Sequence, residues 1–282
     1  MTASRIECYR LSGGGNDFLA LAEPAAQPSP GQIRSWCTRG LSLGADGLFV
    51  IVRSGTGVAM SYFNADGRAA DLCLNGTRCA ARLARHLGWT DGSVAIETGA
   101  GTILATASGN ESVRLELPPP RTAPQRREIE VEGTVWAGWF QEVGVPQFVL
   151  AWPQSLADAP VVELGRRLRH HEAFGAAGTN VMFARFVPPH RLELRSYERG
   201  VEAETLACGT GVLAAGAVAV AEEQLALPIR ALTAGGFELE IHGTLEDGGQ
   251  ITSWGLTGDA RLLARLELEP GADHLPPPPS WS

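Results

Sequence analysis

Alternating apolar and polar residues mark several short strands along the chain. The clearest runs are Val113 to Leu117, Glu128 to Val131, Leu192 to Tyr197 and Phe237 to Ile241. A period of two residues is typical of a strand with one buried face, and the glycine and proline between these runs are typical of turns. The pattern therefore predicts a chain rich in β-strands.

Helical patterns are fewer, and two are clear. The first runs from Thr77 to Leu87 and is followed by Gly88, at the position where a left-handed helix cap is favoured. The second, Val212 to Glu223, is apolar on every side, so other structure must enclose it. Two such helices indicate two similar halves. The predicted fold class is α+β, with two pseudo-symmetric halves that are each a curled, mainly antiparallel sheet wrapped around a central helix.

A weak internal repeat supports the two halves. When Cys73 is aligned with Cys208, a helix of small residues follows each cysteine. The same alignment matches Tyr62 with Tyr197, Asn64 with Arg199, and Gly76 with Gly211. Self-similarity of this kind is what a duplicated unit leaves in a sequence.

The proline run Pro118 to Pro120 marks the predicted domain boundary, because prolines cannot continue a strand ladder. The predicted domains are an N-terminal half of residues 1–119 with 261–282, which carries Cys73, and a C-terminal half of residues 120–260, which carries Cys208.

Composition narrows the chemistry. The chain has 282 residues, 44% of them apolar, which is enough for one large domain or two ordinary ones with a sizeable core. All 23 basic residues are arginine, so no side-chain amine is available for a pyridoxal phosphate Schiff base, a lysine-dependent aldolase or a P-loop nucleotide site. The formal net charge of −8 disfavours nucleic acid as a partner, because phosphate binding needs clustered positive charge. A small soluble ligand is the preferred partner.

The cysteine spacing and the short apolar runs of the chain lead us to expect a cytoplasmic location. The five cysteines have no C-x-x-C spacing, so neither a disulfide scaffold nor a zinc ribbon is indicated and the thiols are expected to be reduced. Met1 to Arg10 lacks the apolar core of a signal peptide, and the longest apolar run, Val212 to Ala221, is shorter than the roughly 20 residues that a membrane span needs. We therefore expect no export and no membrane partner. The tail from His274 to Ser282 has four consecutive prolines and is predicted to be loose.

Two cysteines precede glycine-containing turns at the start of the predicted helices. The stretches are Cys73-Leu74-Asn75-Gly76-Thr77 and Cys208-Gly209-Thr210-Gly211. At a helix N-terminus, unpaired amides and the positive end of the dipole lower a thiol pKa and bind an anion. Cysteine is also a common core residue, and we interpret Cys8, Cys37 and Cys79 in this way because they lack such surroundings. The matched settings of Cys73 and Cys208 instead predict reactive thiols beside a carboxylate pocket.

Two thiols facing one small substrate would suit inversion of a carbon centre. A proton must leave one face of the carbon while another arrives on the opposite face, and a single base would return the proton to the side it came from. We therefore expect a thiolate on one half and a thiol on the other to exchange roles across an interdomain cleft. The sequence has no lysine for pyridoxal phosphate and no cluster of metal ligands, so hydrogen bonds and helix dipoles would have to stabilise the carbanion.

Six short motifs follow one another along the chain. They are Gly13 to Phe18, Gly44 to Gly47, Asn64 to Gly67, Asn75 to Ala80, Gly178 to Val181, and Tyr197 to Gly211. Together with the two cysteines, these motifs resemble those of the diaminopimelate epimerase family. The resemblance implies an epimerase that converts L,L-diaminopimelate to the meso form in lysine and peptidoglycan precursor synthesis. It also implies a diaminopimelate epimerase-like fold of two similar halves, a homodimer, and no cofactor or metal.

The resemblance further implies roles for individual residues. Cys73 and Cys208 would be the two acid/base residues of the reaction. The reacting amino-acid end of the substrate would be held by Asn16, by Glu198 and by the backbone amides of Leu74, Asn75, Gly76, Gly209 and Thr210. The distal, unreacted end would be bound by Asn64, Asn180 and Arg199.

The chain departs from the family pattern at two places. Leu74 follows Cys73 where the family commonly has glycine, and Gly144-Val145-Pro146-Gln147 replaces Gly-Asn-Pro-His. Val145 lacks the side-chain amide that would bind substrate, and Gln147 cannot take a proton as histidine can. The substrate is therefore open between diaminopimelate, which the guanidinium of Arg199 favours as a fork for a second carboxylate, and another amino acid such as histidine.

Two other functional classes stay open as well. A cysteine hydrolase or acyltransferase could use Cys208 as nucleophile with a histidine as base, although this leaves Cys73 unexplained. A ligand-binding protein could keep the pocket without catalysis, and the only residue that suggests this is Gln147 in place of histidine.

Overall fold

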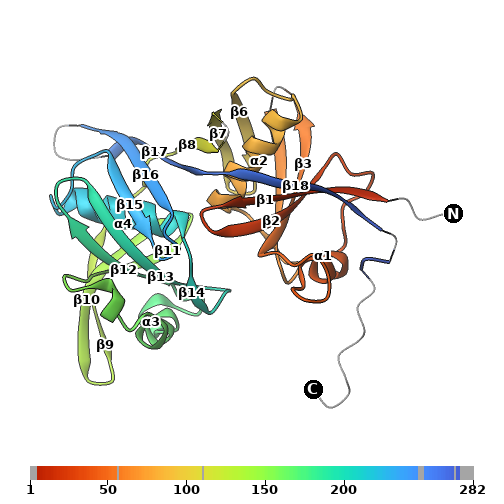
Figure 1. The fold of residues 1–282 in the computed structure, drawn as a ribbon. Helices are drawn as coiled ribbons and strands as arrows, with labels where there is room; N and C mark the ends of the chain where they lie inside the picture. Colours follow the sequence, from red (N-terminus) through yellow and green to blue (C-terminus); the bar gives the residue numbers. More distant parts are fainter. Residues whose placement is uncertain (1–4, 56, 110, 247–250, 270, 274–282) are drawn as a thin grey trace, which may run out of the picture. The chain divides into compact units, whose positions relative to one another are not determined.

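The computed structural model describes residues 5–55, 57–109, 111–246, 251–269 and 271–273. The chain forms two compact units, Met1–Val113 with Ala260–Ser282, and Arg114–Asp259 (Figure 1). The tail from His274 to Ser282, which is predicted to be loose, lies outside the described residues.

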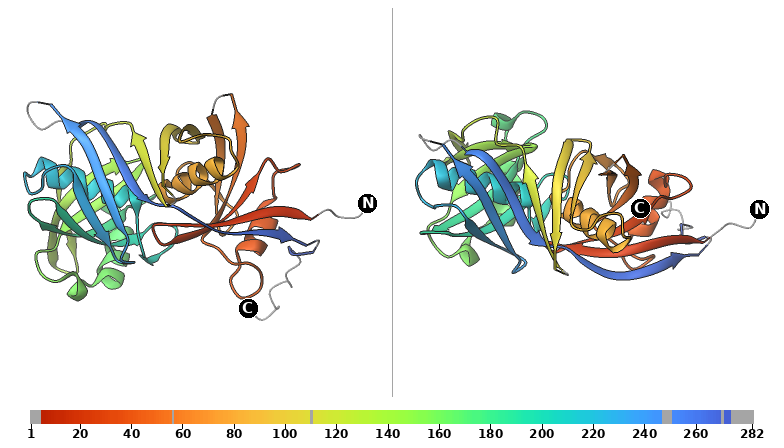
Figure 2. Two further views of the ribbon diagram at one scale, coloured as in Figure 1. Left: turned by 45° about the horizontal axis from the view of Figure 1, so that its top comes forward. Right: turned by 90° about the horizontal axis from the view of Figure 1, so that it is seen from above.

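In the first unit a mainly antiparallel sheet surrounds one helix. The strands are β1 (Ile6–Gly13), β2 (Asn16–Ala22), β3 (Gly47–Ser54), β4 (Gly57–Asn64), β5 (Ala69–Ala70), β6 (Ser93–Thr98), β7 (Gly101–Ser108) and β18 (Arg261–Leu268). They pair in the order β18, β1, β2, β3, β4, β6 and β7, antiparallel except for β2 with β3 and β4 with β6, and β5 adds to β4. Helix α2 (Leu74–His86) contacts β18, β1, β2, β3, β4, β6 and β7, and Figure 2 shows it lying against them. The short helix α1 (Pro30–Cys37) packs on β3.

The second unit repeats this plan around helix α4 (Gly209–Ala221). Its strands are β9 (Gln125–Val131), β10 (Thr134–Val143), β11 (Val145–Ala151), β12 (Asn180–Val187), β13 (Arg191–Glu198), β14 (Ala203–Thr205), β15 (Ile229–Thr233), β16 (Glu238–Leu245) and β17 (Ile251–Asp259). They pair in the order β9, β10, β11, β12, β13, β15, β16 and β17, antiparallel except for β11 with β12 and β13 with β15, and β14 adds to β13. Helix α3 (Val161–Arg169) packs on β12 and β13, and two 3-10 turns, η1 (Leu156–Asp158) and η2 (Glu172–Phe174), flank it in sequence.

The strands of the two units pair in the same order. In each unit the parallel pairs fall at the same places in the order, and a very short strand, β5 or β14, leads into a cysteine and then into the enclosed helix. Tyr62 on β4 and Tyr197 on β13, which the internal repeat aligns, stand on equivalent strands. The prediction of two pseudo-symmetric α+β halves is therefore confirmed.

The enclosed helices begin one turn earlier than their apolar periodicity predicts. α2 begins at Leu74 rather than Thr77, and α4 begins at Gly209 rather than Val212. These first turns contain glycine and polar residues, which give no apolar repeat, so the hydrophobic pattern starts only after them. Gly88 after α2 has φ +71°, the left-handed cap that the sequence predicts.

The chain passes from the first unit to the second within β8 (Ser112–Leu117), ahead of the proline run used as the sequence boundary. β8 pairs with β17, which belongs to the second unit, so its later residues group with that unit. The return to the first unit lies between Asp259 and Ala260.

Burial follows the hydrophobic pattern closely. Every residue of α4 except Thr210 and Ala221 is buried, as its all-apolar sequence requires. Cys8, Cys37 and Cys79 are also buried in the core, as expected of packing residues. Among the residues that the structure describes, no helix is both long and apolar enough to span a membrane.

Candidate functional site

Cys73 caps the N-terminus of α2. Its backbone is extended, with φ −141° and ψ 103°, and its Sγ accepts a hydrogen bond from the Gly76 amide at 3.4 Å. A Cβ at Gly76 would lie 3.2 Å from Met60 Cε, a tight contact that the end of the methionine side chain would have to relieve. The thiol is partly exposed, and the Gly76 hydrogen bond would stabilise negative charge on its sulfur.

The first turn of α2 is held by a chain of side-chain amides. Asn75 Nδ2 donates to Asn16 Oδ1 at 2.7 Å, and Arg78 donates to Asn75 Oδ1 at 2.6 Å. Asn16 Nδ2 in turn donates to Asp46 at 3.0 Å. The side chain of Asn75 is thus engaged within the protein. The backbone amides of Leu74 and Asn75 belong to the first turn and have no carbonyl partner within the helix, so they suit an anion.

The structure therefore brings together Asn16, Leu74, Asn75 and Gly76 around Cys73. Asn64 is the last residue of β4, where its amide donates to Arg68 O at 2.9 Å and its carbonyl accepts from the Gly67 amide at 2.9 Å. Its side chain is exposed.

Cys208 occupies the N-cap position of α4, where its side chain makes no capping hydrogen bond, and it is more enclosed than Cys73. It is 4% exposed, and its Sγ lies 3.5 Å from Thr210 Oγ1. Burial raises the pKa of the Cys208 thiol well above its usual value, and the negative charge of Glu198 raises it further, while the hydroxyl of Thr210 and the Gly211 amide oppose these effects. The thiol form of Cys208 is therefore favoured in this environment.

Glu198 at the end of β13 is the acidic partner of Cys208. Burial raises the pKa of the Glu198 carboxyl, and hydrogen bonds from Thr205 and Cys208 act in the opposite direction. Thr205 Oγ1 donates to Glu198 Oε1 and lies 3.0 Å from Ser196 Oγ, which fixes the carboxylate at the strand end. A carboxylate held in this way can accept a hydrogen bond from the Cys208 thiol.

Asn180 and Arg199 meet at the same end of the β12–β13 pair as Glu198. Asn180 Oδ1 accepts a hydrogen bond from the Arg199 amide at 2.7 Å, and Asn180 is 4% exposed. The side chain of Asn180 therefore fixes the backbone from which the partly exposed Arg199 side chain extends.

Three contacts were not assigned from the sequence. Gln147 on β11 is fully buried, and its Nε2 donates to Thr210 Oγ1 at 3.0 Å. Arg78 lies buried beneath the first turn of α2, and Thr205 holds Glu198. Arg78 and Thr205 fall inside two of the family-like motifs, so a motif position was their signal, whereas the contact of Gln147 depends on strand pairing.

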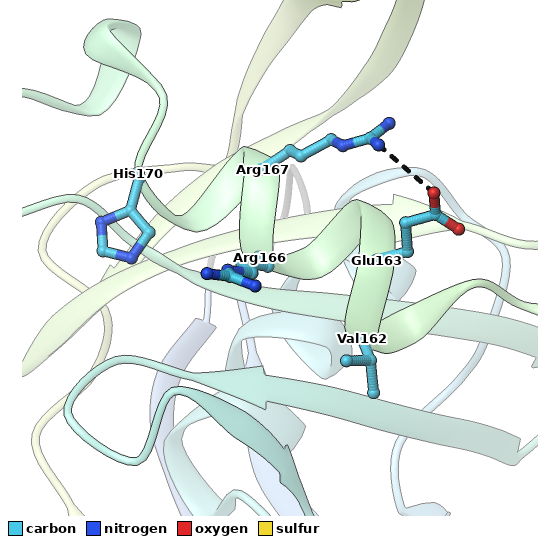
Figure 3. A pocket seen from close by; sticks show the side chains of 5 residues that line it. All are labelled: Val162, Glu163, Arg166, Arg167 and His170. Atoms are coloured by element: carbon cyan, nitrogen blue, oxygen red, sulfur yellow. Dashed lines mark hydrogen bonds and ion pairs between the residues drawn. The ribbon is translucent and has the colours of Figure 1, made fainter.

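A shallow depression of about 600 Å³ lies over α3 (Figure 3). It is lined by Val162, Glu163, Arg166, Arg167 and His170, all from this one helix segment. Arg167 forms an ion pair with Glu163 at 3.2 Å. None of these residues belongs to the predicted site, and the depression includes neither cysteine.

The matches to known sequences include both Cys73 and Cys208. The sequence model of the family described as diaminopimelate epimerase matches residues 8–122 and 140–260. The diaminopimelate epimerase of Aquifex aeolicus (strain VF5) is 35% identical over 251 residues, which cover 84% of this chain and 89% of that protein. The diaminopimelate epimerase of Chlorobaculum tepidum is 37% identical over 210 residues, which cover 73% of this chain and 80% of that protein.

Solved structures with the same fold are more distant in sequence. A hydroxyproline epimerase from Agrobacterium vitis superposes with a TM-score of 0.71 at 15% identity, covering 94% of this chain and 92% of that one. A PhzF-family phenazine biosynthesis protein from Enterococcus faecalis superposes with a TM-score of 0.70 at 16% identity, covering 94% and 99%. At these identities the likeness concerns the fold alone.

Proposed function

The chain belongs to the diaminopimelate epimerase family and is an isomerase, and from this premise we propose that it interconverts L,L- and meso-diaminopimelate without a cofactor. This reaction places it in lysine and peptidoglycan precursor synthesis. One observation carries the proposal: each of two equivalent units presents a cysteine as the N-cap of an enclosed helix.

The two cysteines act as a base and an acid on one α-carbon. Cys73, as thiolate, takes the α-proton, so an S–H bond forms as the α C–H bond breaks. Cys208, as thiol, gives its proton to the opposite face, so its S–H bond breaks as a new C–H bond forms. The Gly76 hydrogen bond to Cys73 and the carboxylate of Glu198 beside Cys208 support this starting state. The next turnover runs in the reverse sense from the exchanged protonation state.

Backbone amides hold the reacting carboxylate and stabilise the carbanion. Each enclosed helix has backbone amides in its first turn, at the positive end of the helix dipole. These are the amides of Leu74 and Asn75 in α2, and those of Gly209 and Thr210 in α4. Such fixed donors stabilise developing negative charge without reorganising. Glu198 offers a negative charge for the substrate ammonium group.

Arg199 recognises the distal end of the substrate. A guanidinium binds a carboxylate through two parallel hydrogen bonds, which favours diaminopimelate over an amino acid with one carboxylate. Asn180 supports this role through its hydrogen bond to the Arg199 amide. Asn64, exposed at the end of β4, is proposed to assist at the same end of the substrate.

The environment of Cys208 argues against a hydrolase. A nucleophilic cysteine needs a lowered pKa and a neighbouring base, usually histidine. Burial and Glu198 raise the pKa of Cys208 instead, and its described partners are Glu198, Thr210 and the Gly211 amide. An acid that must first deliver a proton fits this environment better.

Proton NMR of α-hydrogen exchange in deuterated buffer with a thiol reductant tests the proposal. The purified protein is offered L,L-diaminopimelate and, separately, L-histidine and other amino acids. Exchange with loss of optical purity on diaminopimelate alone is expected. Exchange only on another amino acid would reassign the substrate, and no exchange on any of them would overturn the proposed activity.

From the family resemblance we also propose that the protein is a cytoplasmic homodimer that binds a small amino-acid substrate. Light scattering of the purified protein should give the mass of a dimer. A monomer mass at all concentrations would contradict that part of the proposal.

A further inference from the structure

A chain of hydrogen bonds connects Gln147 to Cys208, although Gln147 has no part in the proposed proton transfers. Gln147 Nε2 donates to Thr210 Oγ1 at 3.0 Å, and Thr210 Oγ1 lies 3.5 Å from Cys208 Sγ. Gln147 is fully buried on β11, and Thr210 is in the first turn of α4. All three residues belong to the second unit, so their arrangement is set within that unit.

The donor in this chain fixes the direction of the next hydrogen bond. A carboxamide nitrogen can only donate, so the Thr210 oxygen accepts from Gln147. A hydroxyl that accepts in this way still has its own proton to donate, and the sulfur of Cys208 lies within reach. The Oε1 atom of Gln147 has no hydrogen-bond partner among the described residues, so Thr210 is the polar group that holds this amide.

Cys208 needs such a donor because everything else around it favours the thiol. The side chain is almost fully buried, and the carboxylate of Glu198 approaches it from β13. In one direction of a two-base reaction Cys208 must nevertheless be a thiolate. From α4, the Thr210 hydroxyl lies within reach of the sulfur, and it and the Gly211 amide both act to lower the thiol pKa.

We propose that Gln147 is a positioning residue that, through Thr210, directs a hydroxyl proton onto the sulfur of Cys208 and so stabilises its thiolate form. The inference rests on the proposed two-cysteine reaction for its purpose, but not for its geometry. A carboxamide does not titrate, so this support is the same at every working pH.

Gln141 provides a matched control for Gln147. It is the direct cross-strand partner of Gln147 on β10 and is 1% exposed. Its Nε2 donates to two backbone carbonyls, those of Thr122 and Glu142, both at 3.1 Å. Gln141→Met therefore removes an equally buried amide from the neighbouring strand without touching Thr210.

The test measures how fast iodoacetamide alkylates Cys208 between pH 7 and 9, by mass mapping of its peptide, with the Cys73 peptide as internal reference. Below the thiol pKa this rate follows the fraction of thiolate. The variants are Gln147→Met, Thr210→Val, the double variant of both, Thr210→Ser and the control Gln141→Met. Steady-state kcat and KM on diaminopimelate are measured alongside.

Thr210→Val removes the hydroxyl and is expected to slow Cys208 alkylation about tenfold or more. Gln147→Met keeps the hydroxyl but no longer fixes its direction, so it is expected to slow alkylation about three- to tenfold. Thr210→Ser should restore the rate, and Gln141→Met should leave it unchanged. Gln147→Met should add nothing in the Thr210→Val background, since it acts through that hydroxyl. kcat should fall with these rates while KM changes by less than about threefold.

Two outcomes would overturn the inference. One is a Gln147→Met protein that alkylates at the wild-type rate, even if it is less stable. The other is additive losses in the double variant, which would mean that Gln147 does not act through Thr210. Because alkylation requires no substrate, failure of the proposed activity on diaminopimelate would be seen separately from either result.

Discussion

Replacing Glu198 by glutamine isolates the effect of one charge on Cys208. Glutamine has the shape of glutamate, and Thr205 Oγ1 can still donate to its Oε1, so the end of β13 is expected to keep its position. The variant loses the negative charge and the carboxylate that accepts a hydrogen bond from the thiol. After burial, these are the features that raise the pKa of Cys208, so Glu198→Gln should lower it.

The size of the change follows from the kind of interaction lost. A hydrogen bond to a charged group contributes about 1.5–3 kcal/mol, which corresponds to roughly one to two pKa units. Cys208 is 4% exposed, so solvent screens the interaction little. Burial, the largest cause of the raised pKa, remains in the variant. The thiolate therefore stays a minority form at pH 8, and its fraction should increase about ten- to a hundredfold.

Alkylation of Cys208 by iodoacetamide at pH 8 measures this fraction, with the Cys73 peptide as reference. We expect faster alkylation together with slower epimerisation, because the variant also loses the charge proposed to hold the substrate ammonium group. Glu193→Gln, on the same strand, removes ion pairs with Arg185 and Arg191 at 3.0 and 2.9 Å and should change neither rate. Unchanged or slower alkylation in Glu198→Gln would refute this account of Cys208.

Three further predictions concern other parts of the molecule. Burial lowers the pKa of His242 below its usual 6.5, so the contribution of neutral His242 to folding stability is fully present above pH 6.5 and decreases as the pH falls. The urea midpoint should therefore be lower at pH 5 than at pH 7, and the difference should be smaller in His242→Leu. A Cβ on Gly165 would lie 2.7 Å from Tyr197 Cβ, so Gly165→Ala should reduce the free energy of unfolding by about 1–3 kcal/mol in denaturant titrations. Asn180→Ala removes the acceptor of the Arg199 amide at 2.7 Å, and steady-state kinetics should show KM for diaminopimelate raised about fivefold with kcat nearly unchanged.

The enclosed helices and the two halves could be predicted because their signals are local. An all-apolar stretch such as Val212 to Glu223 must be surrounded, whatever surrounds it. The repeat around Cys73 and Cys208 then indicates a duplicated plan, which the strand pairings bear out.

The smaller helices carry weaker signals in the sequence. α1 has only eight residues and a weak apolar pattern, yet Ser29 and Gln32 form a capping box at its start with Pro30 behind it. That local signal was available. In α3 the buried positions Val161, Leu164 and Leu168 are too few to distinguish a short helix from the loops around it.

The finer part of the site depends on long-range pairing. Gln147 and Thr210 are 63 residues apart, and their contact requires β11 to lie beside α4 in one register. A shift of the strand by one residue would turn Gln147 to the other face. The chain from Asn16 to Asn75 and Arg78 likewise joins β2 to α2. Sequence motifs can indicate such residues, but only tertiary structure shows which atoms meet.

The central claim is that two thiols, one from each unit, exchange protons with a single α-carbon. The most direct measurement is α-proton exchange and inversion of L,L-diaminopimelate by NMR in deuterated buffer, for the wild-type protein, Cys73→Ala and Cys208→Ala, with folding checked by circular dichroism. We predict inversion with deuterium uptake by the wild-type protein, and a loss of inversion of about a thousandfold or more in each folded variant. Inversion at the wild-type rate in either variant would contradict the two-base account.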